Sequence, residues 1–276
     1  MNLSVRHRTT FTYSGEIADT AMEMRLRPRD DARQRLLSYD LRVEPREAVQ
    51  SYQDGFGNSV ETYNHRAPHR RIVVEARSIV ETQPGQAGGD EPSGAERFRL
   101  LRHDGPVMDV PRVREIAAPL AAGPPEPAVL ADLTALIHRS FVYETNVTCV
   151  SSTVADLIEL GRGVCQDFAH IWIAVSRALG VPARYVSGYL FTGDARQPQA
   201  SHAWAEAWLP GHGWLAHDPT NPAGGVGEGH VRVAVGRDYR DVPPTRGVFR
   251  GAATETLEVD VRVEKVATPT PISFRG

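Results

Sequence analysis

Polar and apolar residues alternate along the first 82 residues, the pattern of strands that bury one face. The clearest run extends from Leu3 to Tyr13. Further strands are predicted at Ala21 to Leu26, Leu36 to Val43, Ser59 to Asn64 and Arg71 to Glu81. Short strands at near-regular spacing predict an all-β domain, either a sandwich or an open barrel.

A stretch rich in glycine and proline, Pro84 to Gly94, has the composition of a linker. We therefore expect residues 1–95 to form an N-terminal β-sandwich-like domain and residues 96–276 to form a second domain that ends in strands. Phe98 to Leu101 is predicted to be extended. Helical spacing of apolar residues then predicts helices at Val113 to Leu120 and Pro127 to Ser140.

The strongest helical pattern follows the short glycine-flanked segment that begins at Gly161. Its apolar residues recur at steps of three and four: Val164, Phe168, Ile171, Trp172, Val175 and Leu179. Gly180 and Pro182 end this helix. Cys165 therefore lies in the first helical turn, where free backbone N–H groups and the helix dipole favour a thiolate.

Three strands are predicted after this helix, at Ala183 to Phe191, Ser201 to Leu209 and Trp214 to Asp218. In the second, His202 shares one face with tryptophans and Glu206, while alanines form the other face and allow a helix to approach closely. The turn Pro210-Gly211-His212-Gly213 makes a hairpin that could bring His202 near Asp218. Cys165, His202 and Asp218 would then supply a nucleophile, a base and an orienting group.

The chain resembles the transglutaminase-like superfamily of papain-type cysteine enzymes. The resemblance covers roughly residues 95 to 250 and is carried by three blocks in order, GVCQDFAH, VPARYVSGYL and SHAWAEAWLPGHGWLAHDPTN. It implies an α+β fold, a papain-like transglutaminase core of helical lobe and antiparallel sheet, preceded by an all-β N-terminal domain. It also implies a triad of Cys165, His202 and Asp218. Members include transglutaminases, deamidases, peptidases and amidases, and some have lost the nucleophile.

Composition narrows the classes of partner. The formal net charge is -3 and the pI is near 6.4, which argue against a nucleic-acid scaffold or a polybasic membrane binder. Two cysteines, Cys149 and Cys165, are too few for a disulfide framework. We found no signal-peptide-like or membrane-spanning apolar run, and we expect a cytoplasmic protein that acts on a peptide, protein or amide substrate. The sequence carries no signal for an oligomeric state.

Several residues have two interpretations. Gln166 and Asp167 either contact substrate or serve only the helix N-terminus, and Trp204 either walls the cleft or packs the core. Tyr143 is a candidate oxyanion donor. We expect Cys149 to be structural, because it lacks catalytic partners.

Three functions compete. The first is hydrolysis of a peptide or amide bond through a thioester on Cys165, and its variant is transfer of the acyl group to an amine. The second is a non-catalytic peptide-binding module. The third is a zinc site drawn from Cys149, Cys165, His170, His202, His212 and His217, although no C-x-x-C or H-E-x-x-H spacing supports it. We expect no cofactor, and no calcium dependence because no acidic calcium loop is visible.

Overall fold

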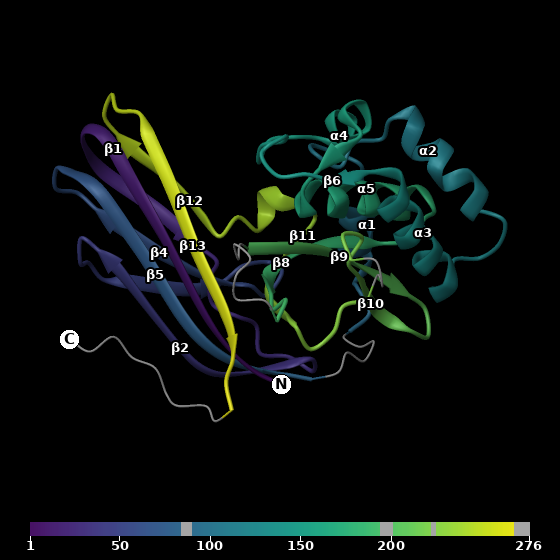
Figure 1. Ribbon diagram of the computed structural model, residues 1–276, viewed down its shortest axis with the longest axis horizontal. Coiled ribbons are helices and arrows are strands. Elements are labelled where there is room, and N and C mark those ends of the chain that lie inside the picture. The colour runs from purple at the N-terminus through teal and green to yellow at the C-terminus, as the bar shows by residue number, and fades with distance from the viewer. Residues whose placement is uncertain (84–89, 194–200, 222–224, 268–276) are drawn as a thin grey trace.

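The computed structural model describes residues 1–83, 90–193, 201–221 and 225–267. Long strands form one side of the molecule, and helices packed on a smaller sheet form the other (Figure 1). Part of the predicted linker, residues 84–89, lies outside the described residues. The described end of the predicted linker caps a helix, α1 (Gly94–Leu101), because Ser93 and Glu96 form a capping box. The predicted extended segment at Phe98 is therefore wrong.

The larger sheet is organised around β1 (Asn2–Met24), whose two halves have different neighbours. Its first half lies between β5 (His69–Thr82) and β13 (Glu255–Lys265). Its second half lies between β4 (Ser59–His65) and β12 (Thr245–Arg250). The remaining strands are β2 (Gln34–Glu44), which pairs with β5, and β3 (Val49–Gln53), which pairs with β4. An irregular segment, with register shifts on both sides, joins the two strands predicted at Leu3 and Ala21 into one.

The sheet is completed from the far end of the chain. β13 pairs antiparallel with β1 from Leu3 opposite Lys265 to Tyr13 opposite Glu255. Sequence order grouped these last strands with the core, whereas their backbone hydrogen bonds join them to the N-terminal sheet. Val261 and Val263 also contribute to the main hydrophobic cluster of the core.

The core contains a helical layer and a four-stranded antiparallel sheet of order β10-β9-β8-β11. Its strands are β8 (Ala183–Leu190), β9 (Ser201–Leu209), β10 (Gly213–His217) and β11 (His230–Gly236). The helical layer comprises α2 (Pro111–Ala117), η1 (Ala118–Leu120), α3 (Pro127–Ser140), α4 (Val154–Leu160) and α5 (Cys165–Ala178), with the small parallel pair β6 (Val142–Tyr143) and β7 (Arg162–Gly163) between them.

Helix α5 is the centre of this core. Nearly all of its residues are buried, and its apolar side chains join one cluster with Ala203, Ala205 and Ala207 of β9. Trp204 and Trp208, which alternate with these alanines, belong to separate clusters on the opposite face. The expected close approach of a helix to an alanine face is present, and the predicted α+β fold is confirmed.

Two side-chain amides attach the larger sheet to β11, which is the edge strand of the core sheet. Gln34 donates to the Arg232 carbonyl at 2.7 Å and accepts from the Arg232 N–H at 2.8 Å. Asn58 makes an equivalent pair of bonds to the backbone of Val235. The backbone N–H and C=O groups of Arg232 and Val235, which an edge strand would leave unpaired, are thus hydrogen-bonded.

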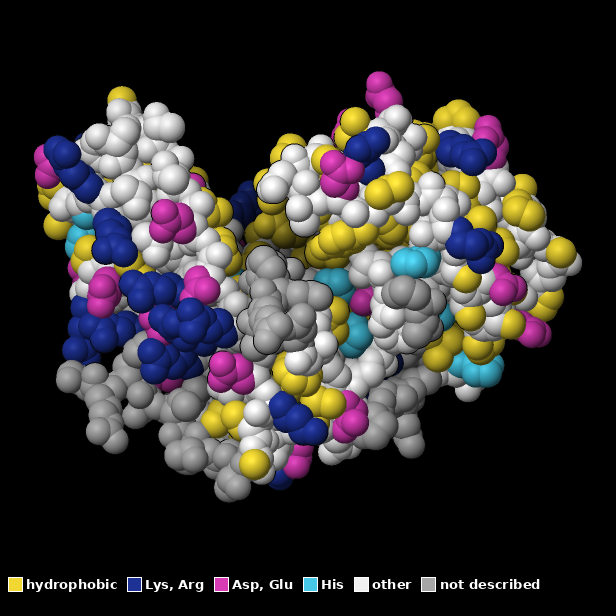
Figure 2. Space-filling view, viewed as in Figure 1, with side chains coloured by type: hydrophobic (Ala, Val, Ile, Leu, Met, Phe, Trp, Pro, Cys, Tyr) yellow, Lys and Arg dark blue, Asp and Glu magenta, His cyan; other side chains and the backbone are white. Residues whose placement is uncertain are grey.

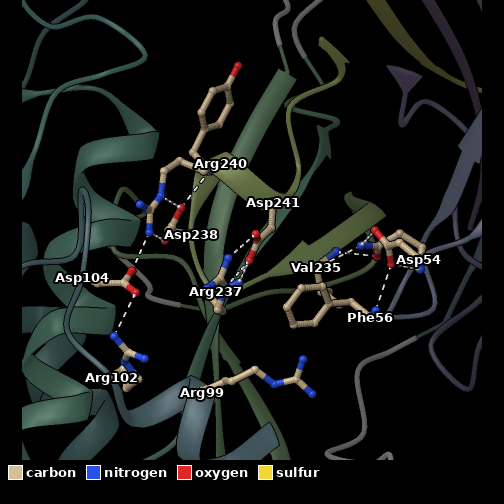
Figure 3. A network of polar contacts seen from close by, with 12 residues as sticks. Asp54, Phe56, Arg99, Arg102, Asp104, Val235, Arg237, Asp238, Arg240 and Asp241 are labelled. Carbon is tan, nitrogen blue, oxygen red and sulfur yellow. Dashed lines mark hydrogen bonds and ion pairs between the residues drawn. The ribbon is translucent and has the colours of Figure 1, made fainter. Parts of the chain in front are cut away.

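An ion-pair network fixes the turn after β11, where η2 (Tyr239–Asp241) returns the chain toward the larger sheet (Figure 3). Arg237 makes a bidentate pair with Asp241, with both N···O distances 2.8 Å. Arg240 bonds Asp238 and reaches Asp104, which precedes α2. These arginines and acids pair with one another, which fits a structural role.

Candidate active site

Cys165 is the first residue of α5 and is partly exposed. The residue before it, Val164, has no side-chain acceptor to cap the helix. Asp167 supplies one instead, because its Oδ2 accepts from the Val164 N–H at 2.8 Å and from the Thr148 hydroxyl at 2.7 Å. Burial raises the pKa of Asp167, and these hydrogen bonds oppose that rise. The helix start that presents Cys165 is therefore held from the side by the 144–153 loop.

His202 connects Cys165 to Asp218. Its Nε2 lies 2.8 Å from Asp218 Oδ2, which leaves Nδ1 for its hydrogen bond with Cys165. Burial disfavours the charged ring, but the hydrogen bonds and charges of Asp218 and Cys165 outweigh it and raise the pKa of His202 to about 10. The geometry therefore favours an imidazolium beside the sulfur.

Asp218 is fully buried and accepts hydrogen bonds on both oxygens. Oδ1 accepts from the Thr220 N–H at 3.0 Å and from its hydroxyl at 2.7 Å. Oδ2 faces His202 and a second histidine, His230, whose Nε2 is 3.2 Å away. Burial favours the neutral acid, yet the bonds from His202, His230 and Thr220 hold the pKa of Asp218 well below its usual range. Asp218 therefore both begins a turn and bonds His202.

The other predicted residues lie around this chain of contacts in different ways. Tyr143, half exposed, directs its hydroxyl at the backbone N–H of Cys165, and burial together with the Cys165 and Asp218 charges raises its pKa to about 12. Gln166 is buried and donates to the Val150 carbonyl at 3.2 Å. Trp204 is 1% exposed and packs beside the rings of His202 and His230.

His230 is the residue that sequence reasoning missed. It opens β11, two strands away from His202 in the sheet, and a glycine-rich loop separates it from Asp218 along the chain. Residues of β11 alternate as in a strand, but alternation does not show that the first side chain turns toward Asp218.

Within the described parts of the chain, one group of His, Cys, Asp or Glu side chains is compact enough to hold a metal ion: His202, Asp218 and His230, with ligand atoms within 4.8 Å of one another. This is not the set considered from the sequence. His170 accepts from the Tyr239 N–H, and His217 bonds the Thr134 hydroxyl.

The face of the molecule shown in Figure 2 carries hydrophobic, charged and histidine side chains. Figure 2 shows histidine side chains at the surface below a band of hydrophobic side chains, on the helix-rich side of the molecule. Over the larger sheet, Lys or Arg side chains lie among acidic ones (Figure 2). One such group is formed by Glu75, which pairs with Arg6, Arg8 and Arg77. No helix among the described residues has the length and apolar character to cross a bilayer.

Two protein-family descriptions match the chain. Residues 3–81 match the bacterial transglutaminase-like N-terminal region, and residues 114–219 match the transglutaminase-like superfamily, a span that includes Cys165, His202 and Asp218. The chain belongs to the transglutaminase-like superfamily. The predicted family is therefore confirmed, including its N-terminal domain.

Two relatives of this transglutaminase-like chain cover nearly all and about half of its length. An uncharacterised protein of Mycobacterium tuberculosis is 35% identical over 291 residues, which cover 95% of this chain and 91% of that protein. A protein-glutamine gamma-glutamyltransferase of Pseudomonas aeruginosa is 32% identical over 164 residues, covering 55% of this chain and 24% of that enzyme. A candidate cysteine protease from Cytophaga hutchinsonii has the same fold, with a TM-score of 0.77 at 21% identity over 100% of this chain and 94% of that one.

Proposed function

We propose that this protein is a cysteine hydrolase that cleaves a peptide or amide bond through a thioester on Cys165. The observation that carries the proposal is His202, whose ring bonds both Cys165 and the buried carboxylate of Asp218. A thiolate beside an imidazolium is the reactive form of a cysteine nucleophile. Asp218 fixes which ring nitrogen faces the sulfur.

In the first half of the reaction, the Cys165 sulfur attacks the carbonyl carbon and the C–N bond breaks. His202 gives its Nδ1 proton to the leaving amine, which departs neutral. The Tyr143 hydroxyl oxygen accepts from the backbone N–H of Cys165, and these two groups would donate to the carbonyl oxygen as it gathers negative charge. The product is a thioester between the acyl group and Cys165.

In the second half, a nucleophile attacks the thioester carbon while His202 takes its proton, and the Cys165 sulfur leaves. With water the product is a carboxylic acid. With an amine the product is a new amide, and the similarity to a protein-glutamine gamma-glutamyltransferase supports that second candidate. We favour water, because it needs no binding site of its own, whereas an amine does.

The proposal can be tested by trapping the thioester. The protein is mixed with a library of blocked peptides and simple amides, quenched in acid, and analysed by intact mass and peptide mapping. We expect an acyl adduct on Cys165 that is absent from Cys165→Ala and present in Cys149→Ala, which removes the other cysteine. Adding an alkylamine then shows whether an acid or an amide is released. Turnover that survives in Cys165→Ala would refute the mechanism.

A further inference from the structure

We propose that His230 is a positioning residue for the triad: its ring N–H donates to Asp218 Oδ2 and holds that oxygen in line with His202. The chain of contacts then runs from Cys165 through His202 and Asp218 to His230. This inference rests on the function proposed above, and it adds a fourth side chain to the three that a thiol mechanism requires.

The protonation of His230 follows from its surroundings. The backbone N–H of Gly227 donates to His230 Nδ1 at 3.2 Å, so Nδ1 acts as the acceptor and carries no proton. The proton of the neutral ring is then on Nε2, which lies 3.2 Å from Asp218 Oδ2 and donates to it. Both ring nitrogens are satisfied, and the side chain is only 5% exposed.

This donor restricts the orientation of the carboxylate. Thr220 holds Oδ1 through two hydrogen bonds, but those bonds alone leave the carboxylate free to rotate about the line toward Thr220. A second donor on Oδ2 removes that freedom and leaves one lone-pair direction for His202. Trp204 packs edge-on against His230 at 5.2 Å between ring centroids and lies tilted to His202 at 6.2 Å, which limits the movement of both rings.

A metal ion would be the competing explanation for two histidines on one carboxylate. Two ligands that share a tetrahedral zinc, with bonds of about 2.0–2.2 Å, lie roughly 3.3 Å apart. His202 Nε2 and Asp218 Oδ2 are 2.8 Å apart, which is a hydrogen-bond distance and too short for that geometry. The spacing therefore favours a shared proton network.

The test compares two substitutions in the 276-residue chain. His230→Gln keeps an amide N–H close to the position of Nε2, and His230→Leu removes the donor at similar volume. His103→Leu serves as control, because His103 bonds the Ala174 carbonyl in the second half of α5 and, among the described residues, makes no hydrogen bond to the triad. The measured quantity is the rate of Cys165 alkylation by iodoacetamide at pH 7, which requires no substrate.

We expect alkylation to fall about tenfold in His230→Leu, the effect of losing one hydrogen bond to a charged group. We expect His230→Gln and His103→Leu to stay within about threefold of the parent. Equal losses in the leucine and glutamine variants, or no loss in either, would overturn the role. If a substrate is known, the loss should fall on kcat with KM unchanged.

A second measurement uses the parent protein and does not require His230→Leu to fold. Nitrogen-15 NMR of the parent protein should show His230 as the neutral Nε2–H form, and a proton on Nδ1 would overturn the proposal. Stoichiometric zinc that binds the parent and is lost in both His230 variants would overturn it as well. Neither the alkylation rate nor the ring tautomer depends on turnover. If both agree with the proposal but no amide substrate is found, the proposed function is refuted and the role of His230 is not.

Discussion

Asn58 and Val235 are joined by two hydrogen bonds across the boundary between the larger sheet and the core. Asn58 Nδ2 donates to the Val235 carbonyl at 2.7 Å, and the Val235 N–H donates to Asn58 Oδ1 at 2.8 Å. Asn58 is fully buried. Arg29 and Asp54 bond the same amide and fix its orientation.

Asn58→Ala is expected to destabilise the protein by about 2–4 kcal/mol, because it leaves a buried carbonyl and a buried N–H of Val235 without partners. The free energy of unfolding from urea titration measures this. The matched control is Asn64→Ala, in an exposed position of β4, which should change stability by less than ~0.5 kcal/mol. Similar values for the two variants would show that the amide bonds to β11 carry no stability.

Glu206 is a fully buried carboxylate surrounded by arginines. Burial opposes its ionisation, but Arg232, Arg184 and Arg33 outweigh that effect and lower its pKa to about 2. Glu206→Gln leaves this positive charge uncompensated and is expected to cost about 3–5 kcal/mol of folding stability. Glu258→Gln, on the exposed face of β13, is the control and should be nearly silent.

The same carboxylate predicts a pH dependence. The folded pKa lies below the unfolded value of about 4.3, so the stabilisation is complete above that value and is lost as pH falls through about 2. Between pH 5 and 2 the parent should therefore lose more unfolding free energy than Glu206→Gln does. If the unfolding free energies of the parent and Glu206→Gln change in parallel over this pH range, the stabilising role of the Glu206 carboxylate is contradicted.

His202 is expected to stay protonated to about pH 10 in the parent protein, and Asp218→Asn should lower that midpoint and slow Cys165 alkylation by roughly tenfold or more. The nitrogen-15 shifts of the ring between pH 5 and 11 report the titration. The folded pKa exceeds the unfolded value of about 6.5, so His202 stabilises the fold fully below that pH, and this contribution is lost as pH rises through about 10. A midpoint near 6.5 in the parent would be the contrary result.

Gly188 lies opposite His202 in the pairing of β8 with β9. A Cβ at this position would come within 2.1 Å of the Val231 carbonyl oxygen and 2.7 Å of the Trp204 ring. Gly188→Ala should therefore cost about 1–3 kcal/mol and displace Trp204, which packs on both histidines. Gly94→Ala, where a Cβ meets nothing within 4 Å, should be tolerated. Tryptophan fluorescence and thermal unfolding distinguish the two variants.

Local patterns predicted much of the core. The three- and four-residue spacing before Leu179 defined α5, and the alternation of tryptophan with alanine defined both faces of β9. The hairpin turn then brought His202 and Asp218 together, because both lie within one short segment. Each of these features depends on residues that are close in sequence.

Features that depend on distant residues were not predicted. Alternation along β13 shows that it is a strand, but it does not specify β1 as its partner. The irregular segment after Tyr13 interrupts the alternation of polar and apolar residues, as a turn does. The sequence therefore predicts two strands where the structure has one. His230 reaches Asp218 only through the order of strands in the sheet, which the linear sequence does not display.

The pairing of β1 with β13 has a consequence for biosynthesis. Among the described strands β1 comes first in the chain and β13 comes last, so the larger sheet cannot close until residues 255–265 have left the ribosome. Until then the first half of β1 keeps one row of backbone groups open to other strands. A nascent or shortened chain that lacks residues 255–265 is therefore exposed to aggregation through this open edge of β1.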